Sequence, residues 1–346
     1  MASTLKDVAA AANVTPTVVS HVLNKKTSTV RVSEATAERV RNAASELGYR
    51  VNVLARNFRG RQTKTIGVLN GQGLVRPQFA HGPRYFATLM DGIVSGAFEH
   101  GISVTLCPQL LGEHPEDGIN DGRFDGLILY SITPSEQTLK VLDQCSVPIV
   151  IIHAHARDFG DKYVTLIADN SQGIGLAIDH LVSLGHVKIG FMIERDASNV
   201  ESEERLQAYV FHMARVGLEC RERDVIDIDQ GRKNLSEYLR EKPLQHSALI
   251  VHADGLASEL IMAAQFHGHS VPADLAIIGF DSTDFCNESR PTLTSVSQPL
   301  FELGGLAARQ LMKLVSGEKP DPLELVLPCS LDVRGSTMTS PLEYCR

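Results

Sequence analysis

Residues 4–24 read TLKDVAAAANVTPTVVSHVLN and carry the start signals of two short helices. Thr4 followed three residues later by Asp7 is typical of a capping box, which satisfies free N–H groups at a helix start. A second helix is predicted to have Thr15 as its N-cap and Pro16 at its first position, where the missing N–H of proline costs no hydrogen bond. The residues expected to face inward are Leu5, Val8, Ala9, Val19, Val22 and Leu23.

Residues 32–48, VSEATAERVRNAASELG, predict a third helix that begins after Ser33 and ends at Gly48. Its expected inward residues are Ala37, Val40, Ala44 and Leu47. Two short helices joined by a tight turn and followed by a third are typical of a helix-turn-helix domain, whose second helix enters the major groove. Pro16, Thr17, Ser20 and His21 lie away from the apolar stripe of that helix and are expected to face DNA. The alternative is a small helical bundle with no partner.

Charge is distributed unevenly along the chain. Residues 1–65 hold eleven Lys and Arg against four Asp and Glu, a balance of +7, which leaves −15 for the rest of a chain whose net charge is −8. A basic N-terminal segment followed by an acidic remainder indicates a protein that binds nucleic-acid phosphates through its N-terminal part. The alternative is that the uneven charge distribution arose by chance.

The bulk composition fits a globular, cytoplasmic chain. With 346 residues the chain is too long for a single compact core. It has no apolar run of membrane-spanning length, and its N-terminus, MASTLKDVAAAANV, does not resemble a secretory signal. The six cysteines are scattered without a CxxC pair, which favours reduced thiols in the cytosol.

From Thr65 onward, short β-branched segments alternate with helical stretches. The strand candidates are TIGVLN (65–70), ISVTLC (102–107), GLILY (126–130), VPIVII (147–152), KIGFMI (188–193), ALIVH (248–252) and LAIIGFD (275–281). Helices are expected at 86–100, 135–145, 171–185, 203–217 and 255–268. This alternation predicts an α/β body of doubly wound parallel sheets, with ligands bound at the carboxyl ends of the strands, between two lobes.

The first sixty residues resemble the headpiece of the LacI/GalR family of transcriptional regulators. The resemblance rests on TLKDVAAAANVTPTVVSHVLN and on VSEATAERVRNAASELGYRVNVLARNFR (32–59). It implies that Pro16, Thr17 and His21 meet bases. Asn13 stands where the family has Gly, and Val18 replaces a Thr that contacts the DNA backbone, so one phosphate hydrogen bond is expected to be lost. The complete set of DNA-binding candidates is Thr4, Thr15, Pro16, Thr17, Ser20, His21, Asn24, Asn52, Ala55, Phe58 and Arg59.

The hinge candidate is NVLARNFR (52–59), long enough for two turns of helix before Gly60. So short a helix is marginal in water and is expected to fold only on DNA or against a second copy. In the family it enters the minor groove, where an apolar wedge unstacks the central base step. Phe58 occupies the wedge position, normally Leu, and Val51 replaces the usual Pro. As the alternative, Phe58 is a core residue of a linker.

The resemblance continues to residue 337 through DNSQGIGLAIDHLVSLGHVKIGFM (169–192), VPADLAIIGFDS (271–282) and neighbouring segments. It implies a two-lobed, periplasmic-binding-protein-like body that binds a small-molecule effector, sugar-like in chemistry. The effector-binding candidates by this match are Tyr85, Phe86, His153, Arg205, Asp254 and Asp281. Surface salt bridges at strand ends are the simpler explanation for these polar side chains.

Two differences from the family pattern bear on the chemical nature of the effector. His153, in the unusual HAHA, stands where a strand-ending Asp is common, and the long loop from Asn70 to Arg84 carries Arg76 and His81. The added positive charge favours an acidic sugar or another anionic effector.

Other classes of function have weaker support. HAH (153–155) and HGH (267–269) do not supply three or four converging metal ligands, so no metal or other cofactor is expected. Gly71-Gln-Gly73 lacks the third glycine of a dinucleotide motif, and no nucleophile motif occurs, so an enzyme is not expected. A sugar-binding transport component would share the lobed fold, but it would not need residues 1–60. An architectural DNA-binding protein fits poorly with the large acidic body.

The predicted organisation is a headpiece at residues 1–50, a hinge and linker at 51–63, and an effector-binding and dimerisation domain at 64–340. Two-fold related half-site readers imply a homodimer on a near-palindromic operator. In the family that the chain resembles, tetramers carry a C-terminal helix with a leucine repeat. The C-terminal TMTSPLEYCR has no such repeat, so the resemblance implies a dimer rather than a tetramer.

Overall fold

The computed structural model describes residues 3–24, 32–49, 63–70, 85–107, 122–132, 134–194, 200–228 and 233–338. The chain divides into two compact units, Met1–Lys64 and Thr65–Arg346. The hinge candidates Asn52, Ala55, Phe58 and Arg59 and the loop residues Arg76, His81 and Arg84 lie outside the described residues.

The first unit is a small bundle of three helices, α1 (Leu5–Ala11), α2 (Pro16–Asn24) and α3 (Glu34–Glu46). The predicted capping box is present, because the Thr4 side chain accepts from the Asp7 N–H and the Asp7 carboxylate accepts from the Thr4 N–H at 2.7 Å. Ser33 caps α3 through its hydroxyl, which accepts from the Thr36 N–H at 3.3 Å. The buried core consists of Val8, Ala9, Ala12, Val19, Val40, Ala43 and Ala44.

The prediction that Leu47 faces this core is wrong. Helix α3 ends at Glu46, and Leu47, its C-cap, is 38% exposed. Gly48 then turns the chain with a φ of 61°, and Tyr49 packs against the core instead, its N–H bonded to the Ala44 carbonyl at 2.8 Å.

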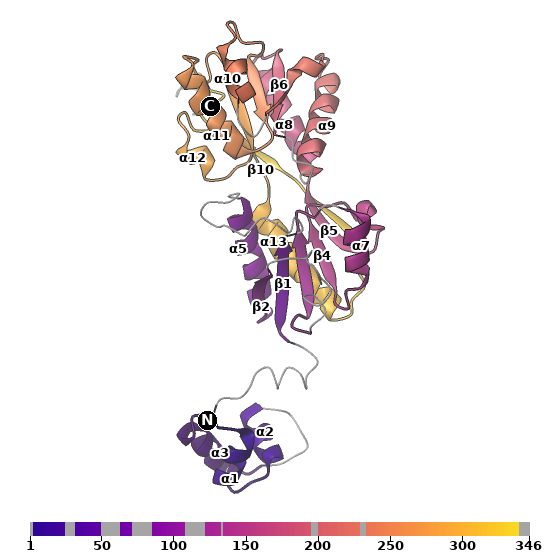
Figure 1. The fold of residues 1–346 in the computed structure, drawn as a ribbon, viewed down its shortest axis with the longest axis vertical. Helices are drawn as coiled ribbons and strands as arrows, with labels where there is room; N and C mark the ends of the chain where they lie inside the picture. The colour runs from indigo at the N-terminus through magenta and orange to yellow at the C-terminus, as the bar shows by residue number, and fades with distance from the viewer. Residues whose placement is uncertain are drawn as a thin grey trace. The chain divides into compact units, whose positions relative to one another are not determined.

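The second unit contains two six-stranded sheets, each the centre of one lobe (Figure 1). In the first lobe all strands are parallel, in the order β11-β5-β4-β3-β1-β2. The strands are β1 (Thr65–Asn70), β2 (Ser103–Cys107), β3 (Gly126–Tyr130), β4 (Ile149–Ile152), β5 (Val164–Ala168) and β11 (Glu324–Leu327). The helical elements are α5 (Tyr85–Phe98), α7 (Glu136–Asp143), η1 (Ala156–Phe159) and α13 (Leu300–Val315).

The second lobe has the strand order β12-β10-β9-β8-β6-β7, with only β12 antiparallel to its neighbour among the strands described. Its strands are β6 (Ile189–Ile193), β7 (Val225–Asp227), β8 (Ala248–Val251), β9 (Ala276–Asp281), β10 (Thr294–Ser297) and β12 (Ser330–Asp332). Its helical elements are α8 (Asn170–Ser183), α9 (Val200–Arg215), η2 (Glu222–Asp224), α10 (Lys233–Arg240), α11 (Asp254–Phe266) and α12 (Phe285–Glu288). The predicted α/β architecture with two parallel sheets is confirmed.

The chain passes between the lobes three times, from β5 to α8, from β10 to α13 and from β11 to β12. Asn170 begins α8 after the first crossing, and Gln298 lies within the second. Polar side chains at these crossings therefore lie near the carboxyl ends of strands from both lobes, where parallel sheets bind ligands.

Helices α5 and α13 pack very closely inside the first lobe, through glycines on both helices. A Cβ placed on Gly304 would collide with the Leu89 carbonyl oxygen and lie 2.8 Å from the Ile93 nitrogen. A Cβ on Gly92 would collide with the Phe301 carbonyl oxygen. These glycines allow the two backbones to touch, which places α13 against β3, β4 and β5.

Candidate functional site

The helix α2 presents part of its N-terminal end to solvent. Thr15, Pro16 and Thr17 are exposed, while Ser20 and His21 are half-buried. Val19 is fully buried and fixes the orientation of the helix on the bundle. The exposed first turn is the part of a recognition helix that would reach base edges.

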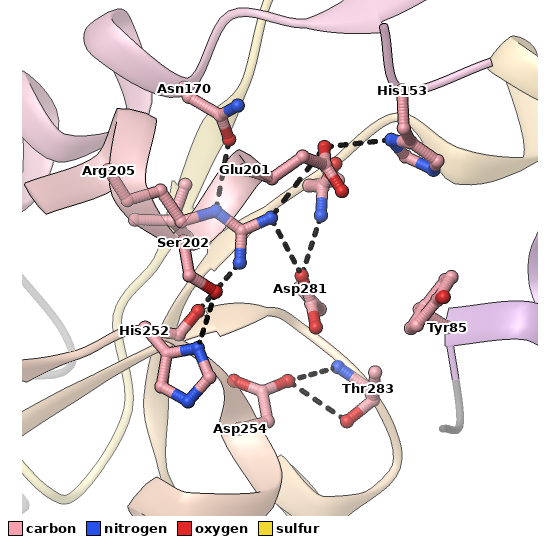
Figure 2. A network of polar contacts seen from close by, with 12 residues as sticks. Tyr85, His153, Asn170, Glu201, Ser202, Arg205, His252, Asp254, Asp281 and Thr283 are labelled. Carbon is pink, nitrogen blue, oxygen red and sulfur yellow. Dashed lines mark hydrogen bonds and ion pairs between the residues drawn. The ribbon is translucent and has the colours of Figure 1, made fainter. Parts of the chain in front are cut away.

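Arg205 is the centre of a buried polar cluster between the lobes (Figure 2). Its Nε donates to the Asn170 Oδ1 at 3.0 Å and its Nη1 donates to the His252 carbonyl at 2.6 Å. Its guanidinium also lies 3.8 Å from the ring centroid of Phe280. These contacts hold one edge of the guanidinium and leave Nη2 facing two carboxylates.

Those carboxylates are Asp281, 3.6 Å from Nη2, and Glu201, 4.0 Å from it (Figure 2). Burial raises the pKa of Asp281 to about 7, although Arg205 opposes the shift. Burial would also raise the pKa of Glu201, but His153 and Arg205 outweigh it and hold that pKa at about 2. The cluster therefore holds one carboxylate with a lowered pKa and one with a raised pKa, both facing the same guanidinium.

Asp254 has a different role from the other candidates, because its carboxylate is used in holding a turn. It accepts from the Thr283 N–H at 2.6 Å, the Thr283 hydroxyl at 2.9 Å and the Ser295 hydroxyl at 2.6 Å. Burial raises its pKa, which these hydrogen bonds oppose. Asp281 ends β9 and Ser282 follows it, with φ of 110° and 52°, so Asp254 stabilises the strained backbone that directs Asp281.

The first lobe contributes His153 and Tyr85. His153 follows β4 with a φ of 63° and its Nδ1 lies 2.8 Å from the Glu201 Oε1. The Tyr85 ring meets the His153 ring edge-on at 6.1 Å, and its hydroxyl lies 3.3 Å from the Ser131 hydroxyl. Phe86 is 3% exposed and stacks on Tyr130 in the core of the lobe, so it does not face the cluster.

Three further residues of the cluster carried no individual prediction. Asn170 and Glu201 both contact groups of the cluster, and Gln298 donates from Nε2 to the Asp281 Oδ1 at 2.6 Å. Among the described residues, the His153 Nε2 and the Gln298 Oε1 are buried without a hydrogen-bond partner. Asn170 stands in the D-N-x-x-G motif and Gln298 precedes Pro299, but neither pattern assigns a role, and Glu201 has no motif.

Histidines of both the HAH (153–155) and HGH (267–269) motifs make contacts with other groups of the protein. His153 and His155 both meet glutamates of α9, and the His269 Nε2 bonds to the Leu239 carbonyl at 2.7 Å. Within the described parts of the chain, no three His, Cys, Asp or Glu side chains are grouped so that they could hold a metal ion. Over the same residues, no helix combines the length and apolarity required to cross a bilayer.

A helix-turn-helix bundle attached to a two-lobed body with a polar cluster between its lobes defines a regulator that couples ligand binding to DNA binding. Residues 4–52 match the family profile of bacterial regulatory proteins of the lacI family, and residues 178–337 match that of the periplasmic binding protein-like domain.

Individual relatives cover nearly the whole chain. The ribose operon repressor of Escherichia coli (strain K12) is 31% identical, with 96% of this chain and 99% of the relative covered. A lac repressor dimer bound to operator and the anti-inducer ONPF superposes with a TM-score of 0.81 at 26% identity, over 98% of this chain and 100% of the other. The complex of the transcriptional regulator CelR with cellobiose superposes with a TM-score of 0.70 at 27% identity, over 96% and 99%. The chain belongs to the LacI family and is a DNA-binding transcriptional regulator.

Proposed function

We propose that the chain is a repressor whose affinity for a near-palindromic operator is set by a small molecule bound at the Arg205 cluster. The observation that carries this proposal is the cluster itself, in which one buried arginine and two carboxylates, at the start of α9 and the end of β9, converge beside His153. Converging charged groups of this kind fix the orientation of a hydroxyl-rich ligand by directed hydrogen bonds.

We place the DNA-reading surface on α2, with Thr15, Pro16 and Thr17 exposed at its start and Ser20, His21 and Asn24 following, and with Thr4 at the start of α1. Asn52, Ala55, Phe58 and Arg59 would form the minor-groove hinge. The boundaries that go with this assignment are residues 1–50 for the headpiece, 51–63 for the hinge and 64–340 for the body.

The sequence-reading role of α2 predicts that His21→Ala relaxes selectivity at one base pair in each half-site. A base-edge contact discriminates by about 1–3 kcal/mol, roughly five- to 150-fold per half-site. The measurement is a binding-site selection from a randomised duplex pool with the wild-type chain and the variant. Identical preference profiles for the two proteins would show that His21 reads no base, and a wild-type chain that selects no sequence would refute the proposed function.

The chemistry of the described cluster favours an uncharged, hydroxyl-rich effector over an acidic one. Arg205 is already matched by Asp281 and Glu201, and His153 by Glu201, so no cation of these residues remains for an anionic ligand. The Gln298 Oε1 is a buried acceptor to which a sugar hydroxyl can donate, so the cluster fits a hydroxyl-rich ligand. We therefore replace the acidic sugar suggested by the sequence with a neutral sugar or sugar derivative.

We further propose that the chain acts as a cytoplasmic homodimer without catalytic activity. The dimeric lac repressor bound to operator supports the two-fold arrangement. The named relatives are transcriptional regulators, which supports a binding function over an enzymatic one.

A further inference from the structure

Two histidines of the first lobe face two glutamates of the second. His153 and His155 follow β4, and Glu201 and Glu204 lie three residues apart in the first turns of α9. The His153 Nδ1 is 2.8 Å from the Glu201 Oε1, and the His155 Nε2 is 2.9 Å from the Glu204 Oε1. We call these two inter-lobe pairs the latch.

The latch is anchored within the first lobe. The His155 Nδ1 lies 3.2 Å from the Glu324 Oε2 at the start of β11, and the Ala156 N–H donates to the same oxygen at 2.9 Å. The two ring nitrogens of His155 therefore face carboxylates on opposite sides, one from each lobe. The His155 side chain is 16% exposed and that of Glu204 is 25% exposed, so water competes only partly for these bonds.

The latch also connects to the effector cluster through one amide. The Asn170 Oδ1 accepts from the Arg205 Nε at 3.0 Å, and its Nδ2 donates to the Glu204 Oε2 at 2.9 Å. Because a single amide group makes both bonds, any rotation of Asn170 that follows a movement of Arg205 also moves the donor away from Glu204. A continuous set of polar contacts thus runs from Arg205 to the first lobe.

We propose that the His–Glu latch holds the two lobes together without a ligand, and that Asn170 makes its strength depend on the state of Arg205. The second half of this inference rests on the proposed function, in which Arg205 binds the effector. Bonds that form only when the lobes are close stabilise that arrangement over an open one, so breaking them shifts the population toward the open state. His155, Glu204 and Asn170 are positioning residues in this account.

The test is the inter-lobe distance in the full-length chain, measured by single-molecule energy transfer with no DNA and no ligand added. Dyes are attached through non-natural azide side chains at positions 140 and 240, which are exposed on α7 of the first lobe and α10 of the second. His155→Phe keeps a planar ring without its nitrogens, and Glu204→Leu removes the acceptor. We expect each variant to raise the open-to-closed ratio roughly tenfold, and the pair His153→Phe with His155→Phe to raise it further.

The matched control is Glu219→Leu, because Glu219 forms an exposed ion pair with Arg221 within the second lobe. It should leave the distance distribution unchanged. Glu204→Gln keeps one acceptor oxygen, which can bond to His155 or to Asn170 but not to both, so it should restore only part of the closed population lost in Glu204→Leu. An unchanged distribution in the double-histidine variant, with its melting transition intact, overturns the latch.

The connection to Arg205 is tested by Asn170→Asp, which keeps an acceptor for Arg205 but replaces the donor to Glu204 with a repelling oxygen. It should open the lobes by no more than Glu204→Leu does, because Glu204→Leu removes the bond to His155 as well. Combining the two substitutions should add little, since Glu204→Leu already removes the contact that Asn170→Asp breaks. Independent, additive effects or no effect of Asn170→Asp would refute the connection. These distance measurements contain no DNA. A chain that selects no operator sequence would refute the proposed function, and it would not refute the His–Glu latch.

Discussion

Replacing Arg205 with alanine is expected to abolish the response to effector while the chain still binds its operator. The guanidinium makes contacts to Asn170, His252, Asp281 and Glu201, and it is 4% exposed. Removing it leaves Asp281 without its cation and Glu201 with His153 alone, and breaking a buried pair in this way destabilises by about 3–5 kcal/mol. Operator binding should persist because α2 belongs to the separate unit Met1–Lys64.

A calorimetric titration of the wild type with neutral sugars and uronates first identifies the effector sugar. Operator binding is then measured by the fluorescence anisotropy of a labelled operator, with and without that sugar. A coupling of typical size changes operator affinity by about 5–150-fold, and the variant should show less than about a twofold change. The matched control is Arg215→Ala, on the same helix, since Arg215 pairs with Asp179 at the surface and is 42% exposed. A wild-type response in Arg205→Ala would show that the effector does not bind at this cluster.

Gly304→Ala is expected to be one of the most destabilising single-methyl additions in the body. The new Cβ would collide with the Leu89 carbonyl oxygen and approach the Ile93 nitrogen at 2.8 Å, and both atoms belong to helix backbone that cannot rotate away. The helices α5 and α13 would have to separate, at a cost of about 3 kcal/mol or more. The thermal transition of the body should fall by roughly 5–10 °C.

Gly305→Ala supplies the comparison, one residue further along the same helix. A Cβ there lies 3.2 Å from the Arg309 Nη1, the flexible end of a side chain, and 3.5 Å from the Gly92 carbonyl oxygen. The gain in helix propensity, about 1 kcal/mol, should make this variant neutral or slightly more stable. Equal melting temperatures for the two variants, measured by calorimetry, would contradict the close approach of α5 and α13.

The headpiece could be predicted in detail because its signals are local. The Thr4–Asp7 capping box and Pro16 at a helix start involve residues within one turn, and both are present as predicted. Leu47 was wrongly predicted to face the core because the apolar spacing of the helix continues beyond Glu46, where the helix ends. Gly48 then redirects the chain, so that Tyr49 packs against the core in its place.

In the body, seven strands were predictable from their β-branched runs, including the partly exposed edge strand β2. The strands β5, β7, β10, β11 and β12 were not predicted, although β5 is fully buried. The helix α13 was not predicted, since FELGG contains two glycines, which disfavour a helix. Gly304 is required there by α5, and a contact between residues so distant in the chain leaves no local pattern.

The effector candidates came from the resemblance, and the structure separates them by environment. Arg205, Asp281 and His153 meet in one cluster, and Asp254 supports the turn that carries Asp281. Phe86 adjoins Tyr85 in the sequence, but successive residues of a helix point in different directions, so it packs into the core. Glu201 was not predicted because its bond to His153 forms only where the two lobes meet, and Gln298 was not predicted because its bond to Asp281 depends on the pairing of β10 with β9.

The central claim is that the basic headpiece reads DNA sequence and the body reports the occupancy of the Arg205 cluster. The most direct measurement is a selection of genomic fragments by the purified full-length chain, beside a chain that begins at Thr65, each with and without the sugar identified by titration. The account predicts enrichment of a near-palindromic site by the full-length chain alone, and a change of at least several-fold in that enrichment when the sugar is present. If the full-length chain prefers no sequence in low salt under either condition, or if the chain without its headpiece selects the same fragments, the account is contradicted.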